Sequence, residues 1–129
     1  MDVAIETVTS MAFDEAVRAT REALVEKGFR ILHEFDLDEV LGPRGGAAAE
    51  RAHVLAACDP EFARRSFEVN RDVALLLPRN VVIREVGGGC VIQTLNPALM
   101  AQAISGGLHD LTDDLTADLV TIMKGLGPR

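Results

Sequence analysis

Hydrophobic and polar residues alternate along several short stretches of this chain, and alternation with a period of two is typical of β-strands. Strands are therefore predicted at five places: 3–8, 29–35, 53–57, 80–86 and 90–95. We expect the first two to pair closely with each other. Gly87, Gly88 and Gly89 predict a hairpin between the last two, because glycine adopts the positive φ angles of tight turns.

Apolar residues recur every three or four positions in two longer segments, as they do on the buried face of an amphipathic helix. The first helix is expected to be capped by Ser10 and to run to about Lys27, where Gly28 can end it. The last helix is expected from about Asp110, with one apolar stripe formed by Leu111, Leu115, Leu119, Ile122 and Met123.

Asp59 and Pro60 together indicate the start of another helix, because aspartate caps exposed N–H groups and proline fits the first turn. This helix should end near Asn70, and Cys58 then lies at a strand-to-helix junction. Shorter segments complete the pattern: helical turns at 38–41 and 98–104, a mobile loop beginning at the 42–46 glycine cluster, and a buried apolar link at 73–77.

Length and composition fit one domain spanning residues 1–129. The chain has 129 residues, of which 48% are hydrophobic, enough to fill one packed core. Helices and strands in this order predict an α+β fold: a two-layer sandwich with a mainly antiparallel sheet of about five strands and helices packed on one face.

The formal charge of −7 argues against nucleic acid as a partner, because affinity for polyanions depends on neutralising phosphates. The chain also lacks Trp and Tyr, which single-stranded binders use to stack bases. No stretch is apolar enough for a membrane span or an export signal, so we expect a cytoplasmic protein without membrane partners. In that compartment Cys58 and Cys90 are expected as free thiols.

Three segments resemble a known family. They are Ala56-Ala57-Cys58-Asp59-Pro60, the stretch from Leu75 to Val82 (LLLPRNVV), and the glycine-rich hairpin that follows. In order and spacing they are similar to the domain-of-unknown-function 302 family, over nearly the whole chain. The resemblance implies a compact α+β fold with helices on one side of a mainly antiparallel sheet, and dimers are frequent among similar proteins. It implies no reaction.

The chain departs from the pattern of that family at two positions. Asp59 stands where asparagine is usual, and Arg79 stands where many members carry a second cysteine. A dithiol mechanism through position 79 is therefore not available to this protein.

Cys58 is the one candidate for catalytic chemistry. A thiol before a helix N-terminus is stabilised as the nucleophilic thiolate by nearby N–H groups and by the helix dipole. The favoured alternative is a small buried residue that packs with Val54 and Ala56 on one strand face. Cys90 has no charged neighbour in sequence that would activate it, so a packing role is expected.

Metal ligation is not predicted. His33, His53 and His109 are scattered and follow no ligand motif, and surface positions explain them. The acidic residues of the last helix lack the order of a calcium loop, so they are read as solvated charges: Asp110, Asp113, Asp114 and Asp118. No cofactor can be named.

Two arginines are candidates for holding an anionic ligand. Arg44 lies in the loop at 42–46, and Arg79 is next to Asn80. The guanidinium group suits carboxylates and phosphates because it donates two parallel hydrogen bonds. The triple glycine is not read as a phosphate loop, since a strand follows it instead of a helix.

The leading hypothesis is a non-catalytic, dimeric module that binds a small or apolar ligand between sheet and helices, near Cys58, Pro78 and Asn80. The sequence supplies a core but no catalytic constellation, so an enzymatic role is not favoured. The alternative is a thiol-based redox or sulfur-handling protein that uses Cys58 with a partner protein. A third reading is a scaffold whose dimer face is its function.

Overall fold

The computed structural model describes residues 2–42 and 50–128. Its elements in chain order are β1 (Ala4–Thr9), α1 (Phe13–Glu26), β2 (Arg30–Asp36), α2 (Leu37–Leu41), β3 (Ala52–Cys58), α3 (Pro60–Val69), the 3-10 helix η2 (Arg71–Leu76), β4 (Arg79–Val86), β5 (Gly89–Leu95), α4 (Ala98–Ala103) and α5 (His109–Leu126). All five strands form close to the predicted bounds. The predicted loop after residue 42 falls mostly outside the described residues.

The five strands form one antiparallel sheet in the order β1-β5-β4-β3-β2. The predicted hairpin is confirmed: β4 and β5 pair from Val81 opposite Thr94 to Val86 opposite Gly89. The prediction that the first two strands pair with each other was wrong. β1 pairs with β5 and β2 with β3, so the two strands lie at opposite edges of the sheet. Their alternation showed that both are strands, but it carries no information about the partner.

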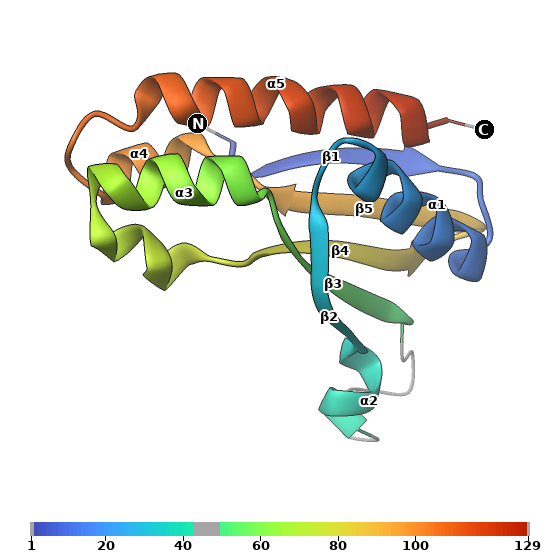
Figure 1. Cartoon of the computed structure of the whole chain (residues 1–129). Coiled ribbons are helices and arrows are strands. Elements are labelled where there is room, and N and C mark those ends of the chain that lie inside the picture. The colour runs from blue at the N-terminus through green and yellow to red at the C-terminus, as the bar shows by residue number, and fades with distance from the viewer. Residues whose placement is uncertain (1, 43–49, 129) are drawn as a thin grey trace.

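Helices cover one face of this sheet, which confirms the α+β two-layer arrangement (Figure 1). α5 runs along β1 and packs against α1, and α1 in turn contacts β3, β4 and β5. The short helix α2 lies apart from this layer, beyond the ends of β2 and β3. In the described ranges, 2–42 and 50–128, no helix is both long and hydrophobic enough to span a lipid bilayer.

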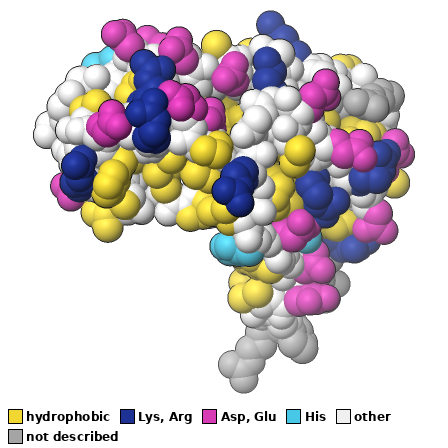
Figure 2. Space-filling model, in the orientation of Figure 1, with side chains coloured by type: hydrophobic (Ala, Val, Ile, Leu, Met, Phe, Trp, Pro, Cys, Tyr) yellow, Lys and Arg dark blue, Asp and Glu magenta, His cyan; other side chains and the backbone are white. Residues whose placement is uncertain are grey.

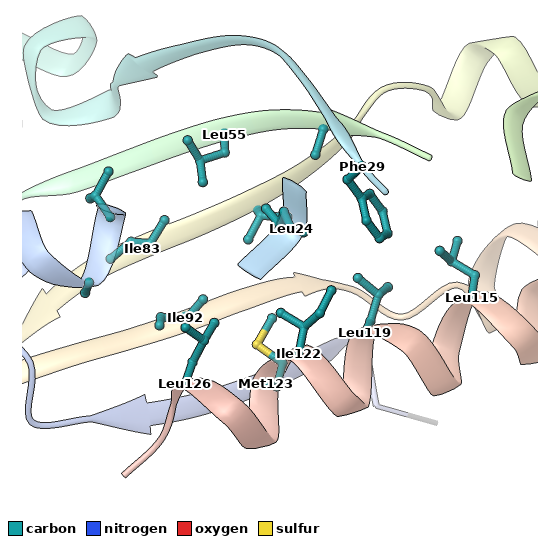
Figure 3. Packing of buried hydrophobic residues seen from close by; sticks show 14 of the residues in the cluster. Leu24, Phe29, Leu55, Ile83, Ile92, Leu115, Leu119, Ile122, Met123 and Leu126 are labelled. Carbon is teal, nitrogen blue, oxygen red and sulfur yellow. The ribbon is translucent and has the colours of Figure 1, made fainter. Parts of the chain in front are cut away.

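The core lies between the helices and the sheet (Figure 3). α5 contributes its predicted stripe: Leu115, Leu119, Ile122 and Met123 are buried, joined by Leu126, while Leu111 is half-buried. From the sheet, Leu55, Ile83 and Ile92 point toward them from three neighbouring strands. Burial of these side chains is the main driving force for folding, at about 1.5–3 kcal/mol for each large one.

The start of α1 differs from the prediction. Ser10 is not the N-cap; the helix begins at Phe13, and Ala12 holds the cap position without a side-chain hydrogen bond. The hydroxyl of Thr9 accepts a hydrogen bond from the backbone N–H of Met11 instead (3.2 Å). Met11 and Phe13 are both buried, so the chain uses these residues to turn from the sheet into the helix layer.

Among residues 2–42 and 50–128, the helices pack on the first face of the sheet and leave its second face uncovered (Figure 1). A row of hydrogen bonds crosses it: Gln93 donates to Glu6 (2.8 Å), and Arg84 donates to Gln93 (3.3 Å) and to Glu50 (3.0 Å). Apolar side chains flank this row, among them Val8, which is 61% exposed. This face therefore presents both charged and apolar side chains to solvent.

Candidate functional site

A pocket of about 510 Å³ opens at the end of the sheet where β4 begins and β5 ends. Three of the predicted ligand-binding residues, Pro78, Arg79 and Asn80, line it together. Cys58 is not part of its lining, and Arg44 lies outside the described residues. Most of the remaining wall is apolar, including Val3, Leu75, Leu76, Val82 and Leu95.

Of the other hollows, two are larger than this pocket but have less suitable walls. One lies between α1 and α5 and is bordered by charged residues, of which Arg18 and Glu22 already pair with each other (3.0 Å). The other lies beside the hairpin turn Gly87–Gly89 and the start of α1. The pocket at Arg79 differs from both because an apolar wall there meets a buried cation, the combination usual in small-molecule sites.

The apolar wall is built by η2 and the segment that follows it. The side-chain oxygen of Asn70 accepts from the N–H of Asp72 (2.9 Å) and so starts the 3-10 turn. Val73 is fully buried and anchors the turn, which leaves Leu75 82% exposed at the pocket. The segment at 73–77 is thus only partly buried, contrary to the prediction, because a 3-10 helix presents successive residues to different sides. Figure 2 shows apolar side chains gathered over η2 and toward β4.

Arg79 is the buried charged residue of the pocket, with 7% exposure. Its side chain faces the helix side of the sheet because its β3 partner, Ala57, belongs to the core. Nη1 donates to the hydroxyl of Thr94 (3.1 Å) and to the carbonyl of Leu95 (2.7 Å), and Nη2 lies 3.8 Å from the sulfur of Met100. All of these acceptors are neutral.

The position of Arg79 is electrostatically unusual. Among the described residues, no acidic side chain lies within ion-pair distance of its guanidinium group. Burial without an opposite charge disfavours the cation and lowers the pKa of Arg79 to about 10. At neutral pH the group still carries its charge, so the pocket contains an uncompensated cation.

Asn80 and Pro78 shape the rim of the pocket. The Asn80 side chain is exposed, and the backbone carbonyl of Asn80 accepts a hydrogen bond from the Thr94 hydroxyl (2.9 Å). The same hydroxyl accepts from Arg79, so Thr94 connects the arginine to the β4 backbone. Pro78 is half-buried.

Cys58 ends β3, at the strand-to-helix junction predicted from the sequence. Burial raises the pKa of its thiol, and the negative charge of Asp59 raises it further, while Arg30 acts weakly in the opposite direction. Asp59 is the confirmed N-cap of α3: its Oδ1 accepts from the N–H groups of Glu61 (3.1 Å) and Phe62 (3.3 Å). Because the carboxylate takes these donors, they do not stabilise a thiolate.

Cys90 is fully buried, as its predicted packing role requires. Its Sγ lies 3.5 Å from the carbonyl oxygen of Met11, and burial raises its pKa. Both cysteines are free thiols. Neither has the low pKa of a reactive cysteine.

A charged cluster on β2 and β3 was not predicted from the sequence. His53 lies between two carboxylates: Nδ1 is 2.7 Å from Asp36, and Nε2 is 2.8 Å from Glu34. Only a doubly protonated imidazole donates to both. Glu34 also pairs with Arg21, and these two partners hold its pKa at about 2, with the arginine hydrogen bond contributing most. The sequence held one sign of this cluster: Glu34 and Asp36 are two positions apart on strand β2, so their side chains lie on the same face.

This cluster does not form a metal site. Across residues 2–42 and 50–128, no group of three or more His, Cys, Asp and Glu side chains is placed to hold a metal ion. His33 and His109 are exposed, and the Asp114 and Asp118 carboxylates lie on the surface of α5. Lys27 lies 4.0 Å from Asp118.

Comparison with known proteins supports the fold and gives no activity. The family model described as "Domain of unknown function DUF302" matches residues 5–126. A crystal structure of an uncharacterized conserved DUF302 protein from Bacillus stearothermophilus superposes with a TM-score of 0.90 at 21% identity, covering 98% of this chain and 100% of the other. No curated protein matches the sequence. At this identity the structural likeness concerns the fold alone.

Proposed function

This chain belongs to the DUF302 family, and we propose that it is a non-catalytic binding module that holds a small, partly apolar ligand in the pocket at Arg79. The main observation behind this proposal is the pocket itself, which is lined both by an exposed leucine, Leu75, and by polar residues of β4 and β5. A volume of about 510 Å³ lies within the usual range for small-molecule sites.

The exposure of Leu75 supports a binding role. A large apolar side chain that is 82% exposed gains nothing from hydrophobic burial in the free protein. Leu76, Val82 and Leu95 lie around the same opening. A ligand placed between these side chains would remove their apolar surface from water, which is the main source of affinity for such a site.

The binding role is tested with Leu75→Ser and with native mass spectrometry of freshly purified protein. Wild-type protein is expected to retain a non-covalent small-molecule mass, and Leu75→Ser to lose it without a change in unfolding midpoint. Val25→Ser is the matched control, because Val25 is also an exposed aliphatic residue but lies on α1, outside the pocket lining. Loss of the mass in both variants, or in neither, would argue against the pocket.

We also propose a homodimer in the cytoplasm. The helix-free face of the sheet supports a second copy as the partner, since it presents exposed Val8 and Leu95 beside a row that contains both Glu6 and Arg84. Opposite charges on one surface allow it to face a copy of itself across a two-fold axis. Two free thiols agree with a reducing compartment.

The dimer is tested by light scattering coupled to size exclusion. Val8→Lys should convert a dimeric wild type to monomers, because a buried unpaired lysine is costly at an interface. Val25→Lys, on the helix side, should leave the mass unchanged. A wild-type protein that is already monomeric at high concentration would contradict the proposal.

Thiol chemistry at Cys58 is the weaker candidate. Its raised pKa and the occupied helix N-terminus both work against a thiolate. Alkylation rates measured against pH decide the matter. A Cys58 thiol that ionises well below pH 8.5 would restore this function, whereas one that reacts only after denaturation would remove it.

A further inference from the structure

We propose that the pocket selects ligands that carry a single carboxylate group on an apolar body, and that Arg79 is the residue that binds the carboxylate. This inference rests on the proposed function of the pocket. It adds the chemical class of the ligand and the group that recognises it.

Arg79 and the residues that its guanidinium group contacts all line the pocket. The three contacts of this group are Thr94, Leu95 and Met100, and each of these residues lines the pocket, as Arg79 does. The groups that hold the guanidinium end of the side chain thus all belong to residues of the pocket lining.

Arg79 lacks the partner that a buried cation requires. Among the described residues, Arg79 is the only charged one that is buried. Burying a charge is costly unless an opposite charge accompanies it. Five arginines that are more exposed than Arg79 do have acidic partners: Arg18, Arg21, Arg51, Arg64 and Arg84. Arg79 is thus buried without the acidic partner that these five have, and an anionic ligand would supply one.

The hydrogen bonds of Arg79 leave room for such a ligand. Both strong bonds come from Nη1, to Thr94 and Leu95. Nη2 contacts only the sulfur of Met100, at 3.8 Å, and a thioether is a weak acceptor. A carboxylate oxygen is a much stronger acceptor for an arginine N–H, and charge-assisted bonds of this kind are about twice as strong as neutral ones.

The rest of the pocket limits the charge and shape of the ligand. Arg79 is the one cation among the lining residues, so it balances one negative charge. The chain carries a formal charge of −7, which repels ligands with several negative charges. Leu75, Leu76 and Val82 surround the opening and fit an apolar body. A monocarboxylate with an aliphatic chain meets all three conditions.

Octanoate and octanamide provide the test, because they share an apolar chain and differ in charge. Affinities for the full chain are measured by calorimetry at neutral pH. Wild-type protein should bind octanoate about tenfold more tightly than octanamide. Arg79→Met should remove that preference while leaving octanamide binding unchanged. Arg71→Met, which removes an exposed arginine of η2, is the matched control and should keep the preference.

The outcomes separate this inference from the proposed function. Equal binding of both compounds to wild-type protein would overturn the carboxylate inference and leave the apolar pocket in place. Binding of neither compound would overturn both. An Arg79→Met variant that still prefers octanoate would also overturn the inference, because the anion would then bind elsewhere. If Arg79→Met fails to fold, Arg79→Lys takes its place: it keeps the charge but not the paired N–H donors, so the preference for octanoate should weaken, and an unchanged preference would overturn the inference.

Discussion

The side chain of Arg79 connects the first residue of β4 to the last residue of β5: its Nη1 lies 2.7 Å from the carbonyl oxygen of Leu95. The hairpin is closed at its other end by the turn at Gly87 and Gly88. One arginine therefore joins the open end of the hairpin and lines the pocket, so the stability of the hairpin and the shape of the pocket depend on the same residue.

Removing the hydroxyl of Thr94 should destabilise the protein. Thr94→Val keeps the side-chain shape but takes an acceptor from Arg79 and a donor from the carbonyl of Asn80. Because both groups are at least partly buried, we expect the free energy of unfolding to fall by about 1–3 kcal/mol, measured by urea denaturation. Thr121→Val removes a hydroxyl from the exposed surface of α5 and should change it by less than about 0.5 kcal/mol. Equal effects of both substitutions would contradict the role of Thr94.

Two neighbouring glycines of the hairpin should respond differently to alanine. A Cβ on Gly89 would collide with the backbone carbonyl of Thr9 on β1, whereas a Cβ on Gly88 meets nothing within 4 Å. Gly89→Ala is expected to cost about 1–3 kcal/mol, because β1 would have to shift. Gly88→Ala should be neutral within about 1 kcal/mol. Thermal unfolding of the two variants checks this, and a tolerated Gly89→Ala would show that β1 moves freely.

Acid should destabilise the protein through Glu34. The pKa of Glu34 is about 2 in the folded protein, compared with an ordinary value of 4.5, so the folded state favours the carboxylate. A lowered pKa stabilises the fold fully above about pH 4.5, and this contribution is lost as the pH falls toward 2. The cluster is partly exposed, so solvent screening reduces the effect to about 1 kcal/mol. Urea midpoints should fall over this range in wild type and less steeply in Glu34→Gln. Glu15→Gln, on the surface of α1, should follow wild type.

The charge and the cap of Asp59 can be separated. Asp59→Asn keeps a side-chain acceptor for the start of α3 but removes the charge that raises the Cys58 pKa. We expect near wild-type stability and a lower Cys58 pKa, read from iodoacetamide alkylation against pH. Asp59→Ala removes both the charge and the capping acceptor. It should lower the Cys58 pKa and also reduce the free energy of unfolding by about 1 kcal/mol. Cys58→Ser gives the background rate. An unchanged alkylation profile in both Asp59 variants would mean that burial alone sets the pKa.

Local features of the fold could be predicted from the sequence, and long-range ones could not. Alternation located every strand, and the Asp59–Pro60 pair located the start of α3. Alternation does not specify the partner of a strand, and for that reason the pairing of the first two strands was predicted wrongly. The N-cap at Ser10 failed because Met11 and Phe13 are pulled into the core before the helix starts.

Only the local part of the candidate site could be predicted from the sequence. Pro78, Arg79 and Asn80 are consecutive, so a local reading could group them. The burial of Arg79 could not be predicted, because it depends on Thr94 and Met100, which lie 15 and 21 positions further along the chain. The contact between His53 and Glu34 was missed because it links residues 19 positions apart.

The order of the strands also has a consequence for how the chain folds during synthesis. β1 is made first, but its partner β5 ends at Leu95, so the first strand has no neighbour until most of the chain has left the ribosome. Such distant pairings slow folding, because a long loop must close before any contact compensates for it. A nascent chain that stops short of β5 would expose β1 as an unpaired edge, which is prone to aggregation. Completion of the sheet is thus tied to the emergence of the hairpin that also lines the pocket at Arg79.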